Sequence, residues 1–432
     1  MSGASRLRPA LEEALSKWQY GFRKKLSVDN AIFGVLRLIE LSENFSGFPV
    51  YLLLLDWEKA YDRIHPDRLE DALRRLGLPE KYLEIIKALY AQMRFVVSDA
   101  FGTSSEEPQA VGLRQGDPLS CLLFILLLSV VMPDAQEEWE QACARKGWTR
   151  CADIVDAVGR PFVTYADDTN LMATTPAVLR EMLHAVQRQA RLYGLMLNLS
   201  KTFFIRLGDA RRQPSPNIKD IDGRSIQLVD SEKTLGFELG AKVTTQNIVR
   251  MRGRSMLSRM NQYKAMWQSE LPARDKLRKY ESLVINKGIW GLHLLALKPS
   301  DFAHLEYIHT RCIRRILKIK AAYWSRVSNA EVLRRAKFAC LTRFIRRKQF
   351  ALLGHILRRP YTDPDPLCCF EPGINLDPRR PPNSKRSRGR PRTTWFESVF
   401  RDFASIGLQR DTLHNRAQDR DGWYRLTESL SA

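Results

Sequence analysis

Two adjacent carboxylates, Asp167 and Asp168, are the residues of this sequence whose chemistry is easiest to read. They stand between two short β-prone runs, 160–164 and 170–174, and so predict a hairpin with an acidic tip. Paired acids at an apolar hairpin tip repel each other and lose hydration, so a cation is needed to stabilise them. Oxygen ligands favour Mg²⁺ or Mn²⁺. The alternative interpretation is ordinary turn chemistry, in which aspartates are common.

A third acid, Asp56, follows the apolar run 50–55, which has the length of a buried strand. A helix start at Pro66 comes soon after it. Asp56 is therefore expected at the C-terminal end of a central strand, where the ligands of α/β sheets gather. If that strand lies beside the hairpin, Asp56 and Asp167 can bind the same two ions. That arrangement is typical of two-metal phosphoryl transfer.

These acids belong to a series of motifs that resembles the ordered palm motifs of reverse transcriptases, most closely those of LINE-like, non-LTR retrotransposons. The resemblance runs from about Gln19 to Leu239. The motifs are Asp56–Asp62, Arg114–Ser120, Tyr165–Asp168 (the YADD motif), Gly194–Thr202 and Thr234–Gly236. Segments farther on resemble the C-terminal regions of many such elements, namely Arg311–Leu317, Leu353–Leu357 and Arg388–Arg392.

The resemblance implies an α/β (α+β) fold: a reverse-transcriptase palm, with an antiparallel sheet backed by helices and partial fingers, then a helical thumb and a basic, mostly helical C-terminal region. The expected domains are residual fingers at 1–48, the palm at 49–240, the thumb at 241–325, and a basic region at 326–432 with a Pro/Arg-rich linker at 360–394. The implied activity is that of an RNA-directed DNA polymerase, a nucleotidyltransferase that adds dNTPs to a primer 3′-hydroxyl. The implied partners are an RNA template and a DNA primer or nicked DNA target.

The resemblance also assigns roles to single residues. Asp56 and Asp167 would bind two Mg²⁺ or Mn²⁺ ions, and Asp168 would help to position the site. Lys201 matches a lysine that donates a proton near the pyrophosphate; the alternative is a solvated lysine at a strand end. Asp62 is expected to stabilise the turn or the following helix.

Tyr61 lies where the family carries an aromatic residue that blocks a ribose 2′-hydroxyl; the alternative is a core tyrosine. Arg114, Gln115 and Gly116 match a loop that packs beneath the incoming nucleotide, where glycine permits close backbone approach. Asp117 is expected to cap the next helix. The turn at Leu235 and Gly236 resembles the primer grip.

Charge is divided unevenly along the 432 residues, which is enough chain for two or three domains. Residues 1–240 carry 30 Lys/Arg against 32 Asp/Glu, whereas residues 241–432 carry 39 against 16. A near-neutral catalytic half joined to a basic half suits a protein that binds duplex phosphates. The alternative is a basic protein whose charge serves only solubility.

An intracellular protein of the nucleus or cytoplasm is expected. The seven cysteines have no regular spacing, which argues against a disulfide framework and predicts no zinc site. No signal peptide is expected. The run Leu119–Met132 predicts a buried helix ending at Pro133, because its 14 residues fall short of the roughly 20 that span a bilayer. No membrane partner follows.

Other elements are predicted from hydrophobic periodicity. In the helix predicted at 79–92, Tyr82, Ile85, Ile86 and Leu89 are expected to face inward. The last 35 or so residues are expected to form one or two loosely held helices. The remaining predictions are helices at 28–41, 66–76, 79–92 and 176–193, a hairpin at 94–112 around Gly102, an insertion at 134–160, and helical regions at 247–320 and 330–358.

The segment Arg388–Pro391, preceded by Lys385 and Arg386, resembles the core of an AT-hook, whose flat Arg-Gly-Arg strip fits the minor groove of A·T tracts. The residues expected to bind nucleic acid there are Arg386, Arg388, Arg390 and Arg392. A nuclear-import signal or a solvated linker is the alternative.

Two alternatives to the polymerase remain. Because only about 18 residues precede Gln19, the chain is expected to be N-terminally truncated, and it would then be a decayed element product that binds nucleic acid without polymerising. An intron maturase shares the palm, but the Arg311–Leu317 and Leu353–Leu357 segments disfavour it. No nicking endonuclease is recognisable in the sequence.

Overall fold

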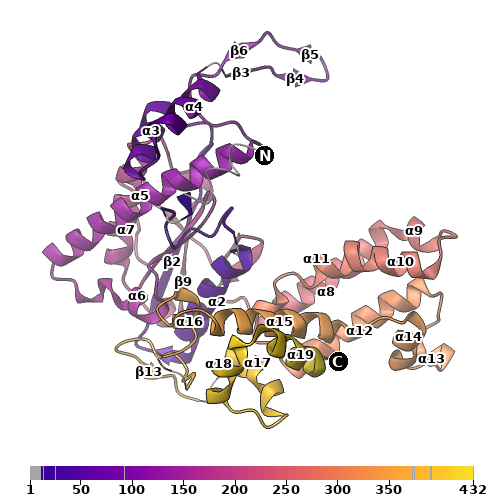
Figure 1. Ribbon diagram of the computed structural model, residues 1–432. Helices are drawn as coiled ribbons and strands as arrows, with labels where there is room; N and C mark the ends of the chain where they lie inside the picture. Colours follow the sequence, from indigo (N-terminus) through magenta and orange to yellow (C-terminus); the bar gives the residue numbers. More distant parts are fainter. Residues whose placement is uncertain are drawn as a thin grey trace. The chain divides into compact units, whose positions relative to one another are not determined.

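The computed structural model describes residues 11–431 apart from positions 13, 25, 92, 372, 374, 390 and 391. Two compact units make up the chain (Figure 1). The N-terminal unit holds the residues up to 35, 41–241 and 381–386, and the C-terminal unit holds 36–40, 242–380 and 387–432. Helix α2 (Val28–Asn44) contributes residues to both.

A mixed sheet forms the centre of the N-terminal unit. Within the described residues its strand order is β10-β9-β2-β8-β7. Strand β2 runs antiparallel to both β8 and β9, and β7 runs antiparallel to β8, whereas the short β10 is parallel to β9. The bounds are β2 (Val50–Leu55), β7 (Phe162–Tyr165), β8 (Asp168–Ala173), β9 (Phe203–Leu207) and β10 (Gln227–Leu228). All six residues of β2 are buried, which explains its uninterrupted apolar sequence.

Helices α3 (Pro66–Arg75), α5 (Pro118–Arg145) and α7 (Pro176–Arg191) back this sheet. Alternate residues of β2, Tyr51, Leu53 and Leu55, join α5 and α7 in one hydrophobic core. The predicted inner face of α7 is confirmed, since Leu179, Leu183, Val186 and Ala190 are all buried. Together with the helical C-terminal unit, the sheet confirms the expected palm-like α/β class.

Helix α5 corrects the prediction that the buried helix ends at Pro133. It continues to Arg145, so the first part of the expected insertion is helical. Proline removes one backbone hydrogen bond, and the buried face formed by Ala135, Trp139 and Cys143 continues the helix beyond it. By length and composition α5 could cross a membrane, but 78% of its apolar window is buried inside the protein, as befits a core helix.

Helix α4 (Glu80–Tyr90) corrects a second prediction. Leu83 and Ile86 are its buried residues, whereas Ile85 and Leu89 are about half exposed. The helix packs mainly on α3 at the edge of the unit, so only a narrow stripe is covered. A two-stranded arm follows it, as predicted, and projects from the helices (Figure 1). Its strands are β3 (Arg94–Phe95), β4 (Ser98–Asp99), β5 (Gly102–Thr103) and β6 (Glu107–Pro108).

The C-terminal unit is helical, which confirms the prediction for residues 247–320 and 330–358. The expectation of loosely held terminal helices is wrong. Trp395, Phe403 and Trp423 are buried, and the rings of Phe403 and Trp423 stack at 5.3 Å. Within the segment expected to be a linker, Phe370 packs against Phe396.

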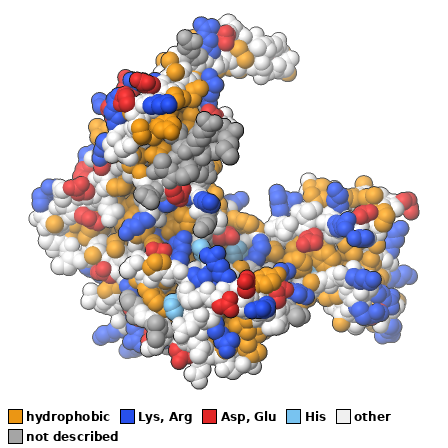
Figure 2. All heavy atoms as spheres, viewed as in Figure 1, with side chains coloured by type: hydrophobic (Ala, Val, Ile, Leu, Met, Phe, Trp, Pro, Cys, Tyr) orange, Lys and Arg blue, Asp and Glu red, His pale blue; other side chains and the backbone are white. Residues whose placement is uncertain are grey.

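The helices of this unit are α8 (Thr245–Gln262), α9 (Lys264–Gln268), α10 (Ala273–Tyr280), α11 (Asn286–Gly288), α12 (Pro299–Ile316), α13 (Ala322–Ser325), α14 (Asn329–Ala336), α15 (Leu341–Leu357), α16 (Pro364–Leu367), α17 (Trp395–Ala404), α18 (Arg410–Gln418) and α19 (Arg420–Ser431). Lys and Arg side chains gather over α13 and α14 (Figure 2).

Candidate active site

Strand register brings the three acids to one end of the sheet. Strand β2 pairs with β8 so that Leu55 faces Thr169. Asp56 is the next residue after β2, and Asp168 is the first residue of β8, so the two lie at adjacent positions. Tyr165 pairs with Asp168, which leaves Ala166 and Asp167 as the two turn residues of the β7–β8 hairpin. The expectation that the strand ending at Asp56 lies beside the acidic hairpin is confirmed.

The electrostatics of this cluster favour a bound cation. Burial raises the pKa of Asp167, and the charge of Asp56 raises it further. The pKa of Asp168 is raised to about 6. Burial is the largest cause, and the charges of Asp167 and then Asp56 raise the pKa further. None of the three acids forms an ion pair with a Lys or Arg of the described residues. The carboxylates therefore carry a negative charge that the surrounding protein leaves uncompensated.

The acids do not form a closed metal cage. Among the described residues no group of three or more His, Cys, Asp or Glu side chains converges as a complete ligand set. Mg²⁺ commonly binds through one or two carboxylates and completes its shell with water and substrate phosphates. The partly open cluster around Asp56 and Asp167 fits that kind of site better than a structural metal site.

Gln19 holds the acidic turn, a role that the sequence motifs did not reveal. Its side-chain Oε1 accepts hydrogen bonds from the backbone N–H of Ala166 at 3.0 Å and of Gly21 at 2.7 Å. Its Nε2 donates to the carbonyl of Ala166 at 3.3 Å. Gln19 is only 1% exposed. The one available signal was its position at the start of the stretch, Gln19 to Leu239, that resembles the family.

The hydrogen bonds of Gln19 to Ala166 and Gly21, called the clamp below, stabilise a turn that is locally unfavourable. Ala166 has a φ of +55°, a left-handed conformation that costs non-glycine residues energy. The backbone around Gln19 pairs with β7, since the N–H of Tyr20 donates to the carbonyl of Thr164 at 2.8 Å. A Cβ on Gly21 would lie 2.3 Å from the backbone nitrogen of Ala166. Only glycine permits this approach, so the close packing depends on Gly21 as well as Gln19.

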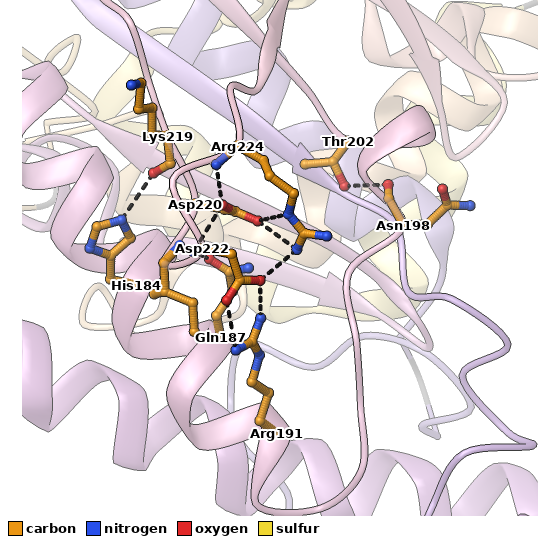
Figure 3. Close-up of polar contacts among 10 residues, drawn as sticks. His184, Gln187, Arg191, Asn198, Thr202, Lys219, Asp220, Asp222 and Arg224 are labelled. Carbon is orange, nitrogen blue, oxygen red and sulfur yellow. Dashed lines mark hydrogen bonds and ion pairs between the residues drawn. The ribbon is translucent and has the colours of Figure 1, made fainter.

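The loop carrying Lys201 wraps around the backbone of Asp56. The carbonyl of Asp56 accepts from the N–H of Asn198 at 2.8 Å. The hydroxyl of Thr202 accepts from the N–H of Asp56 at 3.4 Å and donates to the carbonyl of Asn198 at 2.8 Å (Figure 3). Lys201 itself is exposed. The structure thus places its loop beside Asp56 and leaves its side chain free to reach a ligand.

The neighbouring segment 217–226 is fixed to α7 by a polar network (Figure 3). The buried carboxylate of Asp220 accepts from the backbone N–H groups of Asp222 and Arg224. Gln187 on α7 accepts from the N–H of Ile221 at 3.1 Å, and Arg191 pairs with Asp222. This network stabilises the segment that leads into edge strand β10.

Tyr61 lies between the acids and helix α5. Its ring stacks on Phe124 at a centroid distance of 4.8 Å. The pKa of Tyr61 is raised well above its usual value, first by burial and then by the neighbouring Cys121 and Asp167, so the phenol stays neutral. The ring is half-buried and close enough to Asp167 to be affected by its charge. That position is compatible with the expected contact to a sugar.

The Arg114–Gly116 loop lies against the Tyr61 segment. The N–H of Leu113 donates to the carbonyl of Tyr61 at 2.7 Å. Gln115 donates to Asp62 at 3.3 Å, and its loop is exposed, with Gly116 at a φ of +92°. Asp117 caps α5 by accepting from the N–H of Leu119, as predicted.

The remaining predicted residues lie elsewhere. Leu235 and Gly236 form the two-residue turn between β11 (Ser231–Thr234) and β12 (Phe237–Gly240), with φ values of +49° and +76°. Arg386 lies on the short strand β13 (Lys385–Arg386), which pairs with β1 (Phe45–Ser46) in the N-terminal unit. Arg388 and Arg392 are exposed residues of the C-terminal unit. Arg390 lies outside the described residues.

Comparison with known proteins identifies the family. The model of the family described as reverse transcriptase (RNA-dependent DNA polymerase) matches residues 3–252, more than half of the chain. The chain belongs to the reverse transcriptase family. This agrees with the motifs and with the sheet that carries the acids.

Relatives come from mobile elements. The RNA-directed DNA polymerase from mobile element jockey of Drosophila melanogaster is 27% identical over 327 residues, 72% of this chain and 33% of that protein. The Pol polyprotein from type-2 retrotransposable element R2DM of the same organism is 26% identical over 204 residues, 47% of this chain and 18% of that protein. The chain thus spans a third or less of the length of these two relatives. A telomerase structure from Candida albicans aligns with 78% of this chain and 57% of its own at 13% identity and a TM-score of 0.39, a likeness too low to carry an inference.

We expect Asp168→Asn to raise the thermal midpoint of the metal-free protein near pH 7.5. The pKa of Asp168 in the folded chain, about 6, exceeds the ordinary 3.8, so the folded state binds more protons between those values and gains stability as pH falls through about 6 toward 3.8. Near pH 7.5 the ionised carboxylate instead destabilises the fold, on the order of 1 kcal/mol after allowance for solvent screening.

Thermal unfolding in a chelator, followed by circular dichroism from about pH 5 to about pH 8, tests this expectation. The exposed Asp71→Asn on α3 is the matched control. Other groups titrate over the same range, so the informative quantity is the difference between variant and wild type. Parallel pH profiles for Asp168→Asn and wild type would contradict the proposed repulsion.

A second prediction concerns the clamp. Gln19→Leu leaves the N–H groups of Ala166 and Gly21 unpaired in a buried position, and should lower the free energy of unfolding by about 2–3 kcal/mol. Hydrogen exchange should speed up at residues 164–168. The exposed Gln141→Leu is the control, and equal exchange rates in the two variants would refute the clamp.

Proposed function

We propose that the chain is an RNA-directed DNA polymerase that adds dNTPs to a primer 3′-hydroxyl on an RNA template. The observation that carries this proposal is the β2–β8 register, which sets Asp56 beside the Asp167–Asp168 turn, with Tyr61 close by. Family membership and the printed activity of the jockey relative support it. Priming from a nicked DNA target is the mode proposed, as the resemblance of the motifs to LINE-like elements implies.

Two divalent ions, Mg²⁺ or Mn²⁺, would be held by Asp56 and Asp167. The raised pKa values of Asp167 and Asp168 support this assignment, because a bound cation stabilises the ionised form of carboxylates that burial and the charge of Asp56 disfavour. Bound there, the ions would supply activation of the primer hydroxyl and neutralise charge on the triphosphate. Asp168, behind the turn, would position Asp167.

The surrounding residues then take defined tasks. The exposed Arg114–Gly116 loop would bind the incoming nucleotide, because its backbone is open and already anchored to the Tyr61 segment. Lys201 would deliver a proton to the leaving pyrophosphate from the loop that wraps Asp56. The Leu235–Gly236 turn would hold the primer strand.

Nucleic acid is the proposed partner of the basic half as well. Its 39 Lys/Arg against 16 Asp/Glu would bind template and primer phosphates. The exposed Arg388 and Arg392, together with Arg386, would add a minor-groove contact. A nuclear or cytoplasmic location, where such templates and targets occur, is proposed on the same grounds.

Primer extension tests the proposal. With poly(rA)/oligo(dT), dTTP and Mg²⁺, the intact chain should extend the primer and Asp167→Asn should reduce extension to background. Asp71→Asn, far from the site, should extend like wild type. If wild type binds the template–primer but extends nothing, the chain is an element product that binds nucleic acid without polymerising.

Sugar selection gives an independent prediction. Tyr61→Ala should raise the ratio of ribonucleotide to deoxyribonucleotide incorporation on the order of ten- to a hundredfold, because the ring that excludes the 2′-hydroxyl is gone. Tyr61→Phe keeps the ring and its stacking on Phe124, and should select like wild type. A ratio does not depend on the fraction of folded enzyme. Unchanged selection in Tyr61→Ala would place the tyrosine outside the sugar site.

A further inference from the structure

The C-terminal unit carries an exposed aromatic pair to which no role has been given above. Tyr323 and Trp324, on the short helix α13, are 71% and 75% exposed. Their rings meet edge to face at 5.0 Å, and the guanidinium of Arg326 lies 5.7 Å from the Tyr323 ring. Large aromatic side chains this exposed usually mark a binding surface. We call these three residues the aromatic platform.

The platform is held rigidly from below. Arg314 on α12 is buried and donates hydrogen bonds to the carbonyls of Lys320 at 3.0 Å and Val327 at 2.5 Å, on either side of the platform. It also donates to the side chain of Asn329 at 3.2 Å. A buried arginine that fixes both ends of a loop keeps its rings in place before any ligand arrives. Such preorganisation reduces the entropy lost on binding.

The surroundings of the platform are strongly cationic. Residues 311–337 contain nine Lys or Arg and a single acid, Glu331. Glu331 is already paired with Arg334 and Arg335. Figure 2 shows the Lys and Arg side chains clustered over α13 and α14. The other exposed cations of the segment are Arg311, Arg315, Lys318, Lys320, Arg326 and Lys337.

We propose that the aromatic platform binds unpaired bases of single-stranded nucleic acid, with a base stacked on Trp324 and the flanking phosphates on the surrounding cations. Stacking on aromatic rings within a basic surface is a recurrent mode of single-strand binding. A duplex hides its base faces, so it would gain from the cations but not from the rings. Every base has a π-face and stacking ignores the sugar, so RNA and DNA strands should both bind.

The charge pattern favours nucleic acid over a protein partner. The arm of the N-terminal unit supplies the contrast, because Phe101 at its tip is 98% exposed but its N–H donates to the carboxylate of Asp99, and residues 96–105 contain no Lys or Arg. An exposed ring in a segment without cations cannot attract a phosphate chain, whereas the platform combines rings with cations. The proposal requires binding alone and holds whether or not the chain extends a primer.

Fluorescence anisotropy of the full chain with labelled (U)20 and (dT)20 tests the proposal. Trp324→Ala should weaken both affinities about tenfold, within the range measured for loss of one stacked base. Trp324→Phe should restore most of the loss, and Phe101→Ala should bind like wild type. Because Trp324 is exposed, the thermal midpoint of Trp324→Ala should match that of wild type, which excludes unfolding as the cause.

A blunt-ended duplex and a salt titration separate stacking from charge. Trp324→Ala should bind the duplex like wild type and keep the salt dependence of single-strand binding, since no cation is removed. Arg326→Ala should weaken both probes and reduce the slope of log K against log salt by about 1.

Three outcomes would overturn the proposal. They are wild-type affinity of Trp324→Ala for both oligonucleotides, an equal loss for duplex and single strand, and a loss confined to one of the two sugars. If the oligonucleotides bind normally but sedimentation shows that Trp324→Ala abolishes self-association, the platform is a protein interface instead.

Discussion

The pairing of β2 with β8 is the interaction on which the candidate site depends. It places Asp56 beside Asp168 at the end of one sheet, and the two-residue β7–β8 turn then adds Asp167. Burial raises the pKa values of Asp167 and Asp168, and the charges of the neighbouring acids raise them further. The ligand-free fold is therefore strained electrostatically at the place where a divalent cation would relieve it. A slip of one residue in the register would send these side chains to opposite faces of the sheet.

Other parts of the N-terminal unit hold this costly arrangement in place. The buried side chain of Gln19 satisfies both backbone groups of Ala166, the residue in the left-handed conformation. On the other side, the 198–202 loop fixes the backbone of Asp56 through Thr202 and Asn198. Helix α5 contributes Phe124, against which Tyr61 stacks. The acids, the tyrosine and the Arg114–Gly116 loop are thus attached to one well-packed core, so their separations are set by the fold.

The C-terminal unit combines an aromatic core with a basic surface. Buried aromatic residues such as Trp395 and Trp423 pack between its helices. Residues 241–432 also carry 39 of the 69 Lys and Arg residues of the chain. Arg314 shows how the two are linked, because a buried guanidinium organises a loop whose outer face presents rings and cations. A segment that the sequence shows only as rich in Lys and Arg can therefore hold its exposed rings and cations in a defined arrangement.

The sequence by itself singled out the residues to which the chemistry is assigned. Asp56, Asp167 and Tyr61 stand in short local motifs, and hydrophobic periodicity located β2, the acidic hairpin and the inner face of α7. It failed where distant contacts decide the outcome. Gln19 contacts a turn 147 residues away, α5 passes Pro133 because Trp139 and its neighbours are buried, and α4 exposes Ile85 because little covers that face. Trp423 is buried and holds the terminal helices, whereas Trp324 is exposed, although both are tryptophans. Burial is a property of the neighbours that tertiary packing supplies, and no local pattern encodes which neighbours those will be.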